Sequence, residues 1–122
     1  MSMEPETPDE IKNAIIKSTF LGLEDHGMFI FGLELEYANG NQMAGTYRLD
    51  YYNAKKDVSM SQPYAIPLLT RIIEICGAEK WEDLTGEMIR VKATQTEVLA
   101  IGHIIREEWL VFKEFVKKYG SM

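Results

Sequence analysis

The stretch MFIFGLELEY, residues 28–37, decides the fold of this chain. Its odd-numbered positions are all apolar, whereas Glu34 and Glu36 occupy even-numbered positions. Because side chains alternate between the two faces of a strand, this period of two predicts a half-buried β-strand. We therefore expect a sheet with one face against a core. The apolar positions are Phe29, Phe31, Leu33, Leu35 and Tyr37.

Further strands are predicted on both sides of this stretch. Residues 11–24 are rich in β-branched side chains and lack helix caps, which favours a long strand. The apolar phase slips between Ile15 and Ile16 and again between Phe20 and Leu21, which indicates either a bulge or a strand whose two faces are both partly covered. Gly27 can adopt the positive φ that a tight turn to residue 28 requires. A turn at residues 39–41 then leads to a third strand over residues 43–52, which completes an antiparallel meander.

The second half of the chain predicts a helix, two strands and a final helix. Residues 53–62 are polar and aperiodic, which favours a loop. An apolar stripe at helical spacing then ends at Gly77, a residue typical of helix C-termini. Strands are expected over residues 89–93 and 98–105, and a helix over residues 107–119. The helical stripe consists of Ala65, Leu68, Leu69, Ile72, Ile73 and Cys76.

The resulting order, β-β-β-α-β-β-α, predicts a β-rich α+β fold. A five-stranded antiparallel barrel of the oligonucleotide/oligosaccharide-binding (OB) type has this order, with one helix packed between the third and fourth strands. An open or curled antiparallel sheet with one covered face would have the same order. Both architectures stay open at this point, each with one packed helix and a C-terminal helix.

The composition predicts one globular domain. The chain has 122 residues, 46% hydrophobic and 26% charged, as in ordinary globular proteins. We expect residues 11–122 to form that domain and residues 1–10, which are acidic and contain prolines, to be a flexible segment. No apolar run approaches the roughly 18 residues of a membrane span. One cysteine and an acidic start without a secretory leader favour a reducing cytoplasm.

The sequence contains no recognisable catalytic or metal-binding motif. Zinc and related ions need three or four converging ligands, and His26 and His103 are the only histidines, in no ligand-like spacing. No nucleophile elbow, phosphate-binding loop or dinucleotide fingerprint is present. Cys76 lies in phase with the predicted buried stripe, which favours a packing role. We therefore expect no enzymatic activity, no cofactor and no metal.

Two kinds of binding surface are compatible with the third strand. Its tyrosines and one arginine could stack on single-stranded nucleic acid, but the formal net charge of -6 and nearby carboxylates disfavour phosphate binding. Exposed Tyr and Met side chains favour a protein interface instead, steered by acidic charge. For that interface the Tyr and Met residues are Met43, Tyr51, Tyr52, Met60 and Tyr64. The candidate binding residues are Asp25, His26, Tyr47, Arg48, Asp50, Tyr51, Tyr52 and His103.

Four strings in one order carry a family resemblance. They are STFLGLEDHG (residues 18–27), GTYRLD (45–50), WEDLTG followed by IRV (81–91), and IGHI (101–104). Together they resemble a family of small uncharacterised proteins of tailed phages and prophages. The resemblance implies an accessory protein in the cytoplasm of a bacterial host, one that binds a host or phage protein and could block a defence system.

Three alternatives remain open at the level of sequence. The OB-like order is also compatible with a nucleic-acid-associated factor in phage replication or recombination. A metal-dependent enzyme would need Asp25, His26 and His103 to converge. The C-terminal apolar stripe that contains Trp109 and Phe112 could pack on its own sheet or on a second copy of the chain.

Overall fold

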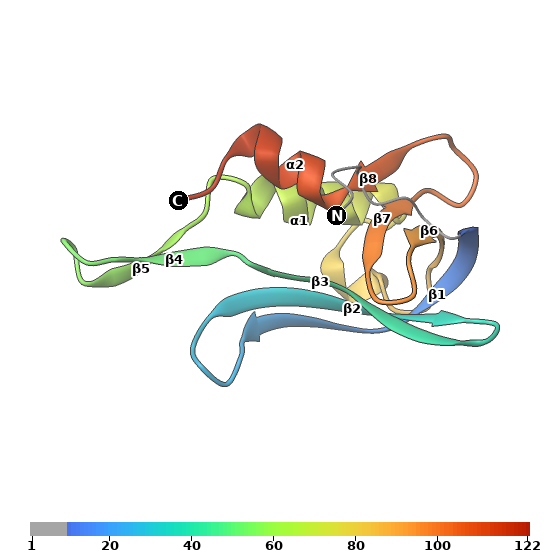
Figure 1. The fold of residues 1–122 in the computed structure, drawn as a ribbon, viewed down its shortest axis with the longest axis horizontal. Coiled ribbons are helices and arrows are strands. Elements are labelled where there is room, and N and C mark those ends of the chain that lie inside the picture. The colour runs from blue at the N-terminus through green and yellow to red at the C-terminus, as the bar shows by residue number, and fades with distance from the viewer. Residues whose placement is uncertain (1–9) are drawn as a thin grey trace, which may run out of the picture.

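The computed structural model describes residues 10–122. The segment predicted to be flexible, residues 1–10, lies outside the described residues except for Glu10. Figure 1 shows a curled sheet with two helices on one side of the β1–β3 meander. The elements are β1 (Glu10–Leu23), β2 (Phe29–Tyr37), β3 (Gly40–Arg48), β4 (Asp50–Asn53), β5 (Val58–Ser61), α1 (Ala65–Ile75), a 3₁₀ turn (Trp81–Asp83), β6 (Met88–Ala93), β7 (Val98–Gly102), β8 (Trp109–Val111) and α2 (Phe112–Tyr119).

The predicted meander is confirmed as β1, β2 and β3. The alternation in β2 has the predicted consequence, because Phe31, Leu33 and Leu35 are fully buried. The register of β1 against β2 shifts between Ile16 and Ser18, which confirms the bulge that the slip in apolar phase predicts. Before the bulge the even-numbered side chains of β1, such as Ile16, face the core, whereas beyond it the odd-numbered side chains, such as Thr19, face inward.

The main sheet has six antiparallel strands in the order β3-β2-β1-β6-β7-β8. β1 is long enough to pair with β6 through its first half and with β2 through its second half. The end strands β3 and β8 are not paired with each other, so the sheet is curled but not closed. The α+β, β-rich prediction is therefore confirmed, whereas the five-stranded barrel is not.

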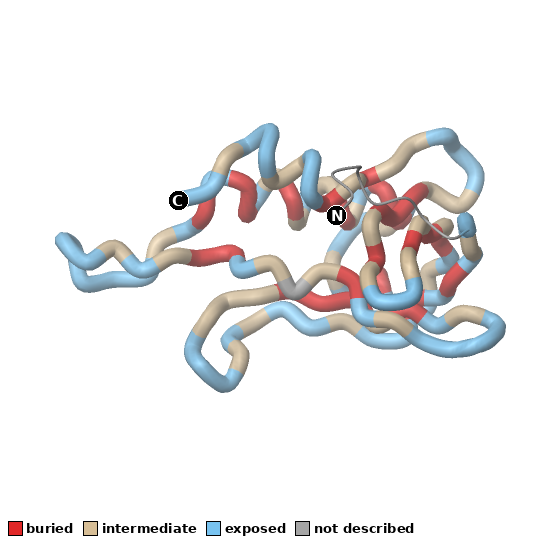
Figure 2. Tube along the Cα trace, viewed as in Figure 1, coloured by how far each residue is buried: buried red, intermediate tan, exposed pale blue. Residues whose placement is uncertain are grey.

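The inner face of the sheet and the two helices share one core. α1 buries Leu68 and Ile72 in the core, as its apolar stripe predicts. It also buries Ile75, which the predicted stripe does not include, whereas Ile73 of the stripe is only half-buried. Phe112, the first residue of α2, is also fully buried in this cluster. In Figure 2 the buried segments follow the inner strands and the inner side of α1. Within residues 10–122 no helix is long and apolar enough to cross a bilayer.

Four segments differ from the sequence-based prediction. The expected strand over residues 98–105 ends at Gly102, because a turn follows in which His103 Nδ1 accepts the backbone N–H groups of Ile105 and Arg106. The expected strand over residues 43–52 ends at Arg48, because Leu49 turns its side chain into the core and its N–H bonds to the carbonyl of Phe29. The expected loop over residues 53–62 contains β5, which pairs with β4. The expected helix over residues 107–119 begins only at residue 112, because β8 first pairs with β7.

Candidate functional site

β4 and β5 form a two-stranded arm, residues 50–61, that is separate from the main sheet. Among the described residues these strands pair only with each other, from Asp50↔Ser61 at the base to Asn53↔Val58 near the tip. The arm projects beyond the rest of the molecule in Figure 1. In Figure 2 the buried segment stops where the arm begins. Isolated two-stranded ribbons are marginally stable in water, so a fixed arm needs an anchor at its base.

Asp50 and Arg48 provide that anchor. The Asp50 carboxylate accepts hydrogen bonds from Arg48 Nε at 2.8 Å and from the backbone N–H of Phe29 at 3.2 Å. Burial alone would raise the pKa of Asp50, but these hydrogen bonds hold it below its ordinary value of 3.8. The Tyr64 hydroxyl donates to the carbonyl of Arg48, and Gln62 Nε2 donates to the carbonyl of Asp50.

An apolar groove of about 510 Å³ lies beside the base of the arm. We call it the arm groove. Asp50 and Ser61 share one face of the arm because they are directly paired, and the Tyr52↔Ser59 pair falls on the same face. Leu23 and Ile66 border the groove with 66% and 67% of their surface exposed. The lining residues are Leu23, Gly27, Phe29, Leu49, Asp50, Ser59, Met60, Ser61, Ala65, Ile66 and Leu69.

The turn between β1 and β2 forms an acidic border of this groove. Glu24 Oε1 accepts the backbone N–H groups of His26 at 2.6 Å and of Met28 at 3.1 Å. The bond from Met28 is the largest cause that lowers the pKa of Glu24, and the neighbouring His26 lowers it further. Glu24 is therefore ionised at neutral pH, next to the exposed carboxylate of Asp25. The neighbouring residues Leu23 and Gly27 line the groove, so the apolar site has negative charge at one end.

The predicted candidate residues separate into three groups in the structure. Asp25, His26, Arg48 and Asp50 belong to the turn or to the base of the arm, near the arm groove. Tyr51 and Tyr52 lie on the arm itself, where Tyr51 contacts Met60 Sδ at 3.8 Å and Tyr52 contacts Asp57. Tyr47 and His103 lie elsewhere.

The predicted stacking platform for nucleic acid does not form one surface. The Tyr47 ring packs against the core, whereas Tyr51 and Tyr52 lie on the arm. Of the side chains predicted for a protein interface, Tyr64 is buried and Met43 lies on β3, away from the arm. The exposed or half-exposed part of that set therefore lies on the arm, with Tyr51 and Met60 on one face and Tyr52 on the other.

The two histidines do not share a site. His103 follows Gly102 of β7. Gly102 lies opposite Arg90 of β6, which in turn lies opposite Asn13 of β1, so His103 is near the first half of β1. His26 follows the other end of β1, and the strand from Asn13 to Leu23 spans roughly 30 Å at about 3.3 Å per residue. In the described part of the chain, no three His, Cys, Asp or Glu side chains are grouped closely enough to hold a metal ion.

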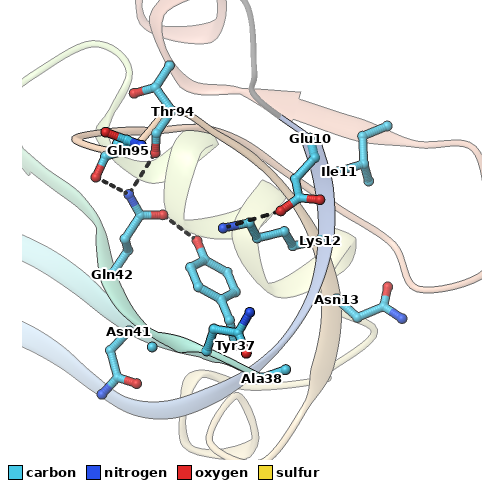
Figure 3. A pocket seen from close by; sticks show the side chains of 12 residues that line it. Glu10, Ile11, Lys12, Asn13, Tyr37, Ala38, Asn41, Gln42, Thr94 and Gln95 are labelled. Carbon is cyan, nitrogen blue, oxygen red and sulfur yellow. Dashed lines mark hydrogen bonds and ion pairs between the residues drawn. The ribbon is translucent and has the colours of Figure 1, made fainter.

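A second hollow, of about 500 Å³, lies where the β2–β3 and β6–β7 turns meet the start of β1 (Figure 3). Figure 3 shows Gln42 reaching from β3 to the carbonyls of Thr94 and Gln95, while the Tyr37 hydroxyl donates to Gln42 Oε1 at 2.6 Å. Burial raises the pKa of Tyr37 to about 12, so this donor keeps its proton. These groups bind one another and tie the two turns together, which is a structural role.

Comparison with known proteins adds no family to this picture. No protein-family model, no curated protein and no solved structure matches the chain. The functional argument therefore depends on the arm, its groove and the charges at its border.

Proposed function

We propose that this protein acts by binding another protein at the arm groove, without catalysing a reaction. The observation that carries the proposal is an apolar groove bordered by Leu23 and Ile66, two large apolar side chains that are each about two-thirds exposed. Burying such a side chain in a partner is favourable by about 1.5–3 kcal/mol when it becomes fully covered. Apolar side chains gathered in a concave surface are typical of recognition sites.

The charges at the groove indicate the chemistry of the partner. Glu24 and Asp25 lie at the turn that borders the groove, and the whole chain carries a formal charge of -6. Arg48, a cation at the base of the arm, is already paired with Asp50. A partner that inserts apolar side chains and places lysine or arginine near the turn would match both the groove and its charge.

The biological setting of the proposal comes from the four sequence strings. Their resemblance to small phage and prophage proteins supports an accessory role in an infected bacterial cell, with a host or phage protein as the partner. Inhibition of a host defence system is one outcome that we propose for such binding. The order β3-β2-β1-β6-β7 further supports a relationship to OB-like barrels, opened here between β3 and β7.

A pulldown from bacterial lysate with matched variants tests this function. Leu23→Asp and Ile66→Asp place a charge in the arm groove, and position 66 lies in the first turn of α1, where an acidic residue is well tolerated. Ile105→Asp is the control, because Ile105 is 84% exposed and lies outside the groove. Lysates are divided into nuclease-treated and untreated halves, and retained proteins are identified by mass spectrometry.

We expect a specific protein that the wild type and Ile105→Asp retain after nuclease treatment and that both groove variants lose by at least tenfold. The retained protein is then purified and its affinity for the four chains is measured directly. Equal affinity for all four chains would overturn the groove as the binding site. Enrichment that disappears with nuclease would favour the nucleic-acid alternative instead.

A further inference from the structure

The outer edge of β5 offers unpaired backbone groups beside the arm groove. Gln62 donates its backbone N–H to the carbonyl of Leu49. Residues that bond across an antiparallel pair alternate with residues that do not, so Met60 and Val58 also direct their backbone groups at β4. Ser59 and Ser61 therefore direct their N–H and C=O groups away from β4. Within residues 10–122, β5 has no other strand neighbour.

The groove follows the backbone of β5. Ser59, Met60 and Ser61 line it in direct succession. Consecutive side chains of a strand point to opposite faces, so three successive lining residues place the groove along the strand itself. An extended segment beside β5 would therefore have the apolar walls at Leu23 and Ile66 within reach of its side chains.

β5 has only four residues, but it lacks the charged side chains, proline and bulge that protect other sheet edges. Natural edge strands are usually protected by charged residues, proline, bulges or short length. β3 has an irregular register near Gly45, which has a φ of +96°, and β8 has three residues and continues directly into α2. β5, with the sequence VSMS, has neither a charge nor a proline.

We propose that the partner binds by adding an extended strand to the outer edge of β5. This inference rests on the proposed function and specifies how the arm groove recognises its partner. The added segment alternates apolar side chains, which enter the arm groove, with polar ones, and it carries a lysine or arginine that lies near Glu24 and Asp25. Hydrogen bonds from the Ser59 backbone supply the register, and the groove supplies side-chain selectivity.

The test uses peptides selected from a random twelve-residue library on the immobilised full-length protein. Binding of the selected peptides is measured by fluorescence anisotropy with wild type, Ser59→Ala and Ser59→Pro. Proline removes the outward N–H of residue 59 without removing a bond to β4, whereas alanine keeps that N–H. We expect an alternating apolar sequence with a basic residue, unchanged binding by Ser59→Ala, and at least tenfold weaker binding by Ser59→Pro.

A second measurement keeps the test decisive if Ser59→Pro does not fold. Backbone amide exchange of the wild-type protein is followed by NMR with and without saturating peptide. Strand addition predicts at least tenfold slower exchange at Ser59. Selected peptides with helical spacing, equal binding by the proline and alanine variants, or unchanged exchange at Ser59 would each overturn strand addition.

The outcomes separate this inference from the proposed function. If Leu23→Asp and Ile66→Asp abolish peptide binding but Ser59→Pro does not, the groove binds its partner without strand addition. If neither kind of variant affects binding, both proposals fail. If light scattering shows a dimer of the wild type that Ser59→Pro converts to a monomer, the strand that pairs with β5 belongs to a second copy, and the proposal of a different partner is overturned.

Discussion

The ring of Tyr47 stacks on the ring of Phe112, with centroids 5.9 Å apart and planes inclined by 27°. The ring of Phe31 also packs on the ring of Phe112, with centroids 6.2 Å apart. The contact joins the start of α2 to β3 and β2. A tyrosine that the sequence places on a possible binding surface thus takes part in the core.

Phe112→Ala should lower the free energy of unfolding by about 3–5 kcal/mol, as large-to-small changes at buried aromatic positions do. The reason is that the ring is 1% exposed and packs on two aromatic neighbours. Urea denaturation measures the change. Ile105→Ala, at an exposed position, is the control and should stay within about 0.5 kcal/mol of wild type. A loss below 1 kcal/mol for Phe112→Ala would contradict this packing.

Gly45→Ala should destabilise the protein through two effects. Its φ is +96°, and an added Cβ would lie 2.3 Å from Phe31 Cε2. We expect about 1–3 kcal/mol from the strained backbone and about 1–3 kcal/mol from overpacking. Gly86→Ala separates the two, because Gly86 has a φ of +93° but no atom within 4 Å of the added Cβ. Equal losses of stability in the two variants would show that the Phe31 contact contributes nothing.

The strongest periodic signals predicted the fold well. β2, the bulge in β1 and the inner face of α1 follow from spacing alone, because burial on one face imposes that spacing. The arm could not be predicted from spacing, because β5 has only two apolar residues, Val58 and Met60, and two positions are too few to show a period of two. The sequence does not predict β8, because the apolar spacing that includes Trp109 fits a helix. In the structure the Trp109 ring lies over Gly102, which has no side chain, and the strand pairs with β7.

The candidate site was only partly accessible to sequence reasoning. The sequence predicts binding residues in the turn (Asp25 and His26) and at the base of the arm (Arg48 and Asp50). Both places lie next to the arm groove. The sequence does not predict Leu23 and Ile66, although each has a signal. Ile66 is apolar but does not belong to the buried stripe of α1. Leu23 lies beyond the bulge in β1, where the alternation of apolar residues no longer shows which side chains face the core. Their proximity depends on the tertiary fold.

Acid should destabilise the wild type more than Asp50→Asn. The pKa of Asp50 is lowered in the folded state, so its ionised form stabilises the fold above the ordinary pKa of 3.8. That stabilisation is lost as the pH falls from about 4 through the lowered pKa of the folded state. Urea midpoints between pH 5 and pH 2 should therefore fall less steeply for Asp50→Asn. Asp25→Asn is the matched control at an exposed carboxylate, and an equal slope in Asp50→Asn and wild type would contradict the prediction.

His103→Ala should loosen the loop between β7 and β8. His103 Nδ1 accepts the backbone N–H groups of Ile105 at 3.0 Å and of Arg106 at 2.9 Å. Each lost hydrogen bond costs about 0.5–1.5 kcal/mol, so a total loss of about 1–3 kcal/mol is expected. Amide exchange at Ile105 and Arg106 should accelerate together. His103→Asn restores an acceptor near the same place and should recover part of the protection, whereas unchanged exchange in His103→Ala would exclude this role.

The Cys76 thiol should resist labelling in the folded protein and report its unfolding. It is 4% exposed, and burial, followed by the charge of Glu87, raises its pKa to about 12. The thiolate is the reactive form, so both access and ionisation are suppressed at pH 8. With a thiol-reactive chromophore, we expect at least a hundredfold slower labelling in buffer than in denaturing urea. Phe112→Ala should accelerate labelling in buffer because it populates open states, whereas Ile105→Ala should not. Fast labelling of the wild type would mean that the helix end at Cys76 opens independently of the core.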